Sequence, residues 1–167
     1  MSEKPTYTQT FNEDLDIDQL LHEGGFLARW YLEVQSNDKK VAEEALKNMI
    51  FNNLMNEPEA QILEVSLYDL KKESSGEDSE YYSGVAEIKL ITTDFRWFIN
   101  LVMRYAPSAI EVIEPEEVKL SSDQIHAILA DVSEISHAYS TQIMSMLKED
   151  ERRELYNRML GIKREEK

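Results

Sequence analysis

Two histidines in one stretch of this chain, His126 and His137, are the side chains best suited to acid–base or metal chemistry. On a straight helix they would share a face, but at about 1.5 Å per residue they would stand roughly 16 Å apart. One metal ion cannot bridge that distance. Glu134 precedes His137 by three residues, which gives a weak two-ligand site at most. We therefore predict surface or interface histidines and no metal site.

An acidic cluster precedes the two histidines in the sequence. It could supply an acid–base pair or oxygen ligands for calcium or magnesium. Its members are Glu111, Glu114, Glu116 and Glu117. The spacing is not that of an EF-hand loop, and no glycine provides the sharp turn that such a loop requires. The cluster is predicted to be a solvated acidic edge.

Nucleophilic and phosphate-binding motifs are missing from the sequence. There is no cysteine, no GxSxG and no glycine-rich phosphate loop. Ser133, Ser136 and Ser140 share one stretch with His137 but have no strained elbow, so they read as small residues that let another helix or a sheet approach closely. We predict a protein without catalytic residues or cofactor, with an enzyme of unknown class kept as an alternative.

The charge balance argues against nucleic acid as a partner. Among the 167 residues, 33 acidic and 18 basic side chains give a net charge of −15, which repels phosphate backbones. The absence of cysteine fits a reducing cytoplasm. The N-terminal stretch lacks an apolar signal core, and no apolar run approaches the roughly 20 residues that span a bilayer. A soluble cytoplasmic protein without a membrane partner is expected.

Hydrophobic periodicity predicts the elements that must position these side chains. Residues from Phe26 alternate as in a strand, a helix follows Asp38 up to Pro58, and two further strands surround the polar tip KKESSGEDSE. A second helix runs from Phe95 to Pro107, and a strand through Ile110 and Val112 ends at Pro115. This βαββαβ order predicts an α+β, ferredoxin-like, four-stranded antiparallel sheet with both helices on one face. Trp30 and Trp97 are expected in its core.

The sequence divides into three parts around this sheet. Residues 1–25 read as a flexible polar tail and a short helix, residues 26–120 as the ferredoxin-like domain, and residues 121–167 as a C-terminal helical extension. Ser121 and Gln124 are spaced as a capping box at the start of a long amphipathic helix. The stretch after Lys148 either continues that helix or forms a separate one.

An interface is expected on the sheet face opposite the helices or on the long C-terminal helix. The candidate residues are Tyr31, Val85 and Ile91 on the sheet and Ile125, Leu129, Val132 and Tyr139 on the helix. The helix could cover the sheet within one chain or pair between chains. The expected partner is a second copy, giving a homodimer, or another protein.

The segment FRWFINLVMRYAPSAIEVIEPEEV, residues 95–118, resembles the C-terminal ferredoxin-like extension of WYL-type bacterial transcription regulators. The likeness departs at Ala106, where that family tends to have Gly. The residues that carry it are Trp97, Tyr105, Pro107, Glu111, Val112, Glu114, Pro115, Glu116 and Glu117. The DNA-binding and WYL domains of those regulators have no counterpart in this chain. The resemblance implies a regulatory, oligomerising or ligand-responsive accessory role.

The sequence therefore predicts a non-catalytic protein-interaction or regulatory module. The alternative is a small-molecule sensing domain that binds an amino-acid-like ligand, because the expected fold hosts both kinds of protein.

Overall fold

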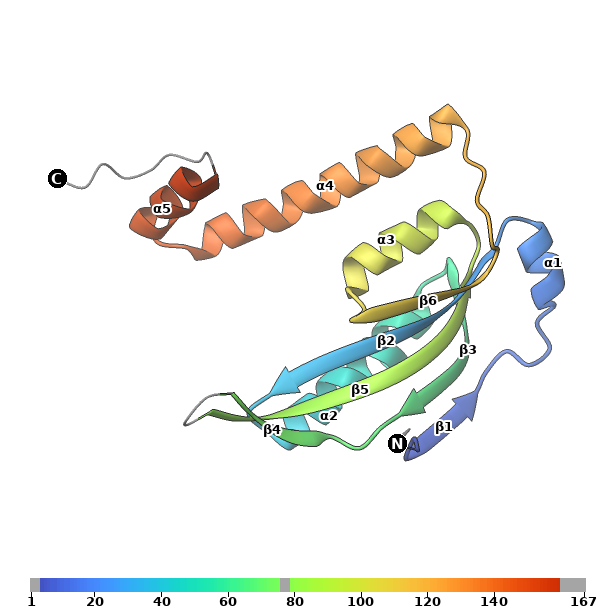
Figure 1. Ribbon diagram of the computed structural model, residues 1–167, viewed down its shortest axis with the longest axis horizontal. Coiled ribbons are helices and arrows are strands. Elements are labelled where there is room, and N and C mark those ends of the chain that lie inside the picture. The colour runs from blue at the N-terminus through green and yellow to red at the C-terminus, as the bar shows by residue number, and fades with distance from the viewer. Residues whose placement is uncertain (1–3, 76–78, 160–167) are drawn as a thin grey trace. The chain divides into compact units, whose positions relative to one another are not determined.

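A computed structural model describes residues 4–75 and 79–159 of the chain, which form two compact units, Met1–Gln124 and Ile125–Lys167. Figure 1 shows the order of the elements. In the first unit these are β1 (Tyr7–Thr10), α1 (Ile17–His22), β2 (Phe26–Ser36), α2 (Lys39–Lys47), a π-helical turn η1 (Asn48–Asn53), a 3₁₀ turn η2 (Leu54–Asn56), β3 (Ala60–Leu67), β4 (Lys71–Ser75), β5 (Ser79–Thr92), α3 (Phe95–Tyr105) and β6 (Ala109–Glu114). Helix α4 (Ser122–Met146) begins at the end of this unit, and α5 (Glu149–Met159) follows it.

The described strands form one antiparallel sheet in the order β1-β3-β5-β2-β6. Strand β4 pairs with the N-terminal part of β5. The α+β class, the antiparallel sheet and the C-terminal helix are confirmed. The expected number of strands is wrong, because the sheet has six strands instead of four. Strand β1 comes from the segment expected to be a mobile tail, and β4 from the polar tip of the hairpin. Residues 76–78 of that tip lie outside the described residues.

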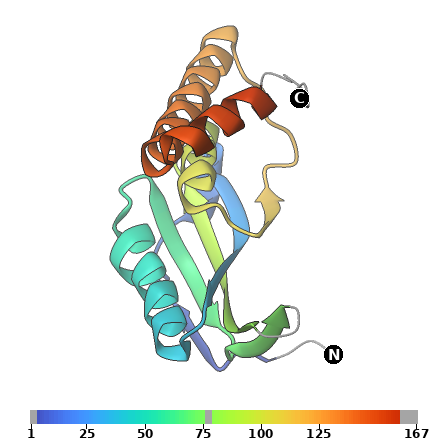
Figure 2. The same ribbon diagram turned by 90° about the vertical axis from the view of Figure 1, so that its left-hand side faces the viewer.

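One face of the sheet carries the main core, which α2 and α3 cover (Figure 2 shows α2 along this face). Trp30 of β2 pairs with Ile88 of β5, and both side chains are fully buried. Phe98 of α3 packs against Trp30 with ring centroids 5.8 Å apart in an edge-on contact. Strand residues alternate between two faces, so this register places every second residue of β2 and β5 in the same core.

A smaller cluster lies on the opposite face, where α1 packs. Leu27, Leu63 and Ile91 are its buried members, with Leu20 and Leu21 of α1 against them. Leu63 lies two positions before Val65, which in a regular strand puts both side chains on one face, but the register of β3 shifts between Ile62 and Glu64. The bulge rotates Leu63 to the other side of the sheet, which a strict two-residue period cannot anticipate.

The helix starts follow the capping chemistry of the sequence. Asp16, Asp38 and Asp94 each accept hydrogen bonds from backbone N–H groups of the first turn, in α1, α2 and α3 respectively. The capping box before α4 is confirmed, since the Ser121 N–H donates to Gln124 Oε1 (2.8 Å) and the Gln124 N–H to Ser121 Oγ (3.2 Å). These bonds satisfy donors that a helix leaves unpaired.

Apolar side chains stay exposed around the edge strand β6. The expectation that Trp97 is a core residue is wrong, because its side chain is 38% exposed. Phe98 and Leu101 take the buried side of α3, and Trp97 lies about 100° away from Phe98 around the helix. Ile110 and Val112 of β6 are likewise exposed, although they pair in register with Trp30 and Ala28.

A triple contact at Glu57 ties the turn before β3 to the end of α3. Arg104 donates from both Nη atoms to the Glu57 carboxylate (2.9 and 3.0 Å), and Tyr105 Oη donates to Glu57 Oε1 (2.6 Å). Burial, and then the bond to Glu57, raises the pKa of the Tyr105 phenol well above its ordinary value. Tyr105 therefore remains a donor throughout the physiological range.

Ala106 ends α3 in the left-handed conformation, with φ 44° and ψ 57°, and its N–H donates to the Val102 carbonyl. An alanine Cβ is strained there and glycine is not. We expect Ala106→Gly to raise the free energy of unfolding by about 0.5–1 kcal/mol in urea titrations, after the extra chain entropy of glycine is subtracted. Ala45→Gly inside α2 is the control and should lose about 1 kcal/mol. Equal losses in both variants would contradict this account.

Candidate functional site

The sheet residues predicted to form an interface do not all reach the surface. Tyr31 of β2 and Val85 of β5 are half-buried on the face opposite the main core. Ile91 lies on the same side but is 1% exposed, because it packs with Leu27 and Leu63 beneath α1. The structure therefore brings Tyr31 and Val85 together and separates Ile91 from them.

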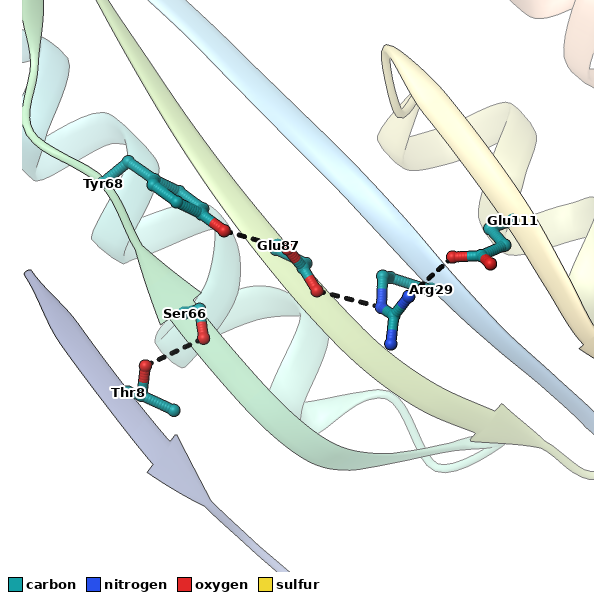
Figure 3. A network of polar contacts seen from close by, with 6 residues as sticks. All are labelled: Thr8, Arg29, Ser66, Tyr68, Glu87 and Glu111. Atoms are coloured by element: carbon teal, nitrogen blue, oxygen red, sulfur yellow. Dashed lines mark hydrogen bonds and ion pairs between the residues drawn. The ribbon is translucent and has the colours of Figure 1, made fainter. Parts of the chain in front are cut away.

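A polar network crosses this open face between three strands (Figure 3). Arg29 of β2 contacts Glu87 Oε1 through Nε (2.9 Å) and Glu111 Oε2 through Nη1 (2.7 Å). Tyr68, which follows β3, donates from Oη to the other oxygen of Glu87 (2.9 Å). At the sheet edge the Thr8 and Ser66 hydroxyls lie 2.9 Å apart. The network therefore joins β6, β2 and β5 to the end of β3.

Each charged group of this network has a partner within it. Burial and the bond to Glu87 raise the pKa of the Tyr68 phenol, so Tyr68 acts as a neutral donor. Burial lowers the pKa of Arg29, but the Glu111 hydrogen bond and the nearby carboxylates outweigh it, so that pKa is raised overall and Arg29 stays cationic. Because each charged side chain contacts one of opposite charge on a neighbouring strand, the network holds the strands in register.

A hollow of about 410 Å³ lies beside this network on the open face. Two of its carboxylates are already engaged, since Ser83 Oγ donates to Glu33 (2.8 Å) and Tyr81 Oη donates to Glu73 (2.9 Å). The lining residues are Tyr31, Glu33, Tyr68, Asp69, Lys71, Glu73, Ser83, Val85 and Glu87. Within the described parts of the chain, no group of three or more histidine or carboxylate side chains is placed to hold a metal ion.

A second hollow, of about 420 Å³, lies between α2 and the ends of β1 and β3. Leu46 and Phe51 are among its apolar lining residues, and Lys39 and Lys47 among its charged ones. Lys47 Nζ is 2.6 Å from Glu43 Oε1, so one of the two cations is already paired. The hollow has room for a small amphipathic molecule, and the polar side chains that line it are all exposed or half-buried.

Helix α4 holds the remaining predicted interface residues and presents them to solvent. Leu129 is 62% exposed, Ile125 and Tyr139 are also exposed, and Val132 is half-buried. Ile143 and Met146 continue the same series, and Met146 is 78% exposed. The sequence prediction of an interface left these two out, although their spacing is the signal that finds them. We call the series Ile125, Leu129, Val132, Ser136, Tyr139, Ile143 and Met146 the α4 seam.

The histidines and most carboxylates of the acidic edge lie exposed on the surface. His126 and His137 are exposed on α4, and Glu114, Glu116 and Glu117 are exposed around the end of β6. Of the acidic edge, Glu111 has the partner already described, Arg29. The contact between Arg29 and Glu111 was not predicted, because it depends on the register in which β2 and β6 pair. None of the helices within residues 4–75 and 79–159 combines the length and the apolar content that crossing a bilayer requires.

Comparison with known proteins places the chain in one family. The family model described as the MJ0538 family matches residues 27–166. A relative from Methanocaldococcus jannaschii, described as an uncharacterized protein, is 30% identical over 98 residues. The matched region is 59% of this chain but 35% of the relative, so the chain spans about a third of that protein's length. No solved structure matches. Because the family model covers most of the sequence, the chain belongs to the MJ0538 family.

Proposed function

We propose that this chain is a non-catalytic protein-interaction module that binds another protein chain through α4. The observation that carries the proposal is the α4 seam, in which large apolar side chains such as Leu129 and Met146 stand in solvent. A helix of this length gains most of its stability from packing an apolar face, so an unpacked seam indicates a missing partner.

The sheet unit is the scaffold of this module, and we propose that its core is ferredoxin-like. Two features support the assignment: β2, α2, β3, β5, α3 and β6 follow one another as βαββαβ, and their strands lie in the order β3-β5-β2-β6. Strand β1 extends this core at one edge, and β4 lengthens the hairpin with β5. The resemblance of residues 95–118 to the extension of WYL-type regulators supports a regulatory rather than an enzymatic use of the scaffold.

The polar side chains of the open face contact one another, which favours the same proposal. Arg29, Glu87 and Tyr68 satisfy one another, and the Glu33 and Glu73 carboxylates accept hydrogen bonds from neighbouring hydroxyls. Such a surface holds the sheet together and does not require a substrate to complete it.

The proposal is tested by capture from the native cytoplasm with tagged wild-type protein and two charge variants. Leu129→Glu puts a carboxylate in the α4 seam, and Ala130→Glu puts the same charge at the next residue, which is exposed but outside the seam. We expect the wild type and Ala130→Glu to retain the same bound chain and Leu129→Glu to lose at least nine-tenths of it, because a buried, unpaired carboxylate costs several kcal/mol.

Circular dichroism and the melting temperature of each variant establish that its fold is intact. Retention of every bound protein by a folded Leu129→Glu variant would refute α4 as the binding element. So would equal losses in both variants, because that result would report net charge and not the seam.

A further inference from the structure

The α4 seam has a regular period that identifies the kind of partner it fits. Its members recur at alternating steps of four and three residues from Ile125 to Met146, an average of 3.5. A straight helix has 3.6 residues per turn, so a stripe that keeps 3.5 over three heptads follows a partner helix in a left-handed supercoil. A sheet or an irregular groove has no need of this period. The seam is about 32 Å long, which is enough for three heptad layers.

The seam is also nearly symmetric about Ser136. Leu129 and Ile143 lie seven residues to either side of it, and Ile125 and Met146, which close the two ends, lie eleven and ten residues away. In an antiparallel pair centred on Ser136, Leu129 lies opposite Ile143 of the other helix, and Ile125 lies within one residue of the position opposite Met146. Each large apolar side chain then faces another, and the small serines allow close approach at the two-fold axis.

Charge favours the antiparallel arrangement over the parallel one. The acidic residues of α4 are Asp123, Asp131 and Glu134, and its sequence contains no lysine or arginine. Lys148 is the second residue after the end of the helix. An antiparallel pair brings Lys148 of each copy near Asp123 of the other and opposes the helix dipoles, whereas a parallel pair would place Asp123 against Asp123.

From the period, the symmetry and the charges we infer that the partner of α4 is α4 of a second copy, paired antiparallel about Ser136. This inference rests on the proposed function, because it names the chain that the interaction module binds. The net charge of −15 opposes self-association, but Asp131 and Glu134 lie off the seam. The contact surface itself is therefore nearly uncharged.

Disulfide cross-linking tests both the partner and the direction, because the chain contains no native cysteine. Ser136→Cys is expected to form a covalent dimer under mild oxidation, since the two residues meet at the axis. Leu129→Cys alone is expected to stay monomeric in denaturing gels, because the two copies of residue 129 would lie about 21 Å apart. The double variant Leu129→Cys/Ile143→Cys is expected to cross-link.

Light scattering on the uncross-linked wild type gives the matching mass measurement, with twice 19.5 kDa expected. Ready cross-linking of Leu129→Cys alone would overturn the antiparallel direction. A monomeric wild type whose Ser136→Cys variant fails to cross-link would overturn self-pairing altogether. If α4-dependent capture of a different protein persisted in that case, the interaction module would stand and only the identity of its partner would fall.

Discussion

Trp30→Ala should lower the free energy of unfolding by about 3–5 kcal/mol, the largest effect of any single truncation proposed for this chain. Trp30 is fully buried between Ile88 across the sheet and Phe98 of α3. Its Nε1 atom has no hydrogen-bond partner among residues 4–75 and 79–159, so the loss measures packing and not a broken hydrogen bond. Urea titration followed by circular dichroism measures the change.

Trp97→Ala is the matched control, because the same side chain is removed from the same sheet unit at a position that is 38% exposed. We expect it to cost less than about 1 kcal/mol, as is usual for surface positions. If Trp30→Ala is too unstable to purify, Trp30→Phe keeps an aromatic ring against Phe98 and should show an intermediate loss. Equal losses at positions 30 and 97 would disprove the placement of the two tryptophans.

Gly25→Ala should be the second most damaging change, with a loss of about 1–3 kcal/mol in the same titrations. A Cβ atom on Gly25 would lie 2.6 Å from the Leu20 carbonyl oxygen and 3.2 Å from the Thr92 carbonyl oxygen. Both neighbours are backbone atoms, so the turn between α1 and β2 must move to admit a methyl group.

Gly84→Ala provides the control for this prediction. The atoms nearest to a Cβ there are side-chain carbons of Leu70 and Leu46, at 3.3 and 3.5 Å, which can adjust. Because alanine restricts the unfolded chain more than glycine does, we expect Gly84→Ala to be neutral or slightly stabilising. A loss at position 84 as large as at position 25 would show that the crowding at Leu20 is not the cause.

The elements with strong local signals were predictable from the sequence. Apolar alternation identified β2 and β5, and Asp94 followed by a helical period identified α3. Strands β1 and β4 were missed because YTQT and KKESS carry no apolar face. Both are strands at the margin of the sheet, which are held by ladder hydrogen bonds and need little buried surface.

In the candidate site, too, the local pattern was predictable and the long-range contact was not. The α4 seam is a local pattern, and its period could be read directly from Ile125 to Met146. The contact between Arg29 and Glu111 joins residues 82 positions apart, so it depended on which strands become neighbours. The exposure of Trp97 could not be predicted from the sequence either. Whether Trp97 or Phe98 faces the core depends on how α3 is rotated against the sheet.

The position of β6 at the end of the sheet has a consequence for polymerisation. Its outer backbone groups have no partner strand in the described sheet, and such an edge can recruit further copies into fibres. Two β6 strands laid antiparallel would bring Glu111 and Glu114 of one copy towards the same carboxylates of the other, and Pro107 and Pro115 prevent the strand from lengthening. The acidic edge is therefore expected to oppose open-ended stacking of β6 strands from successive copies.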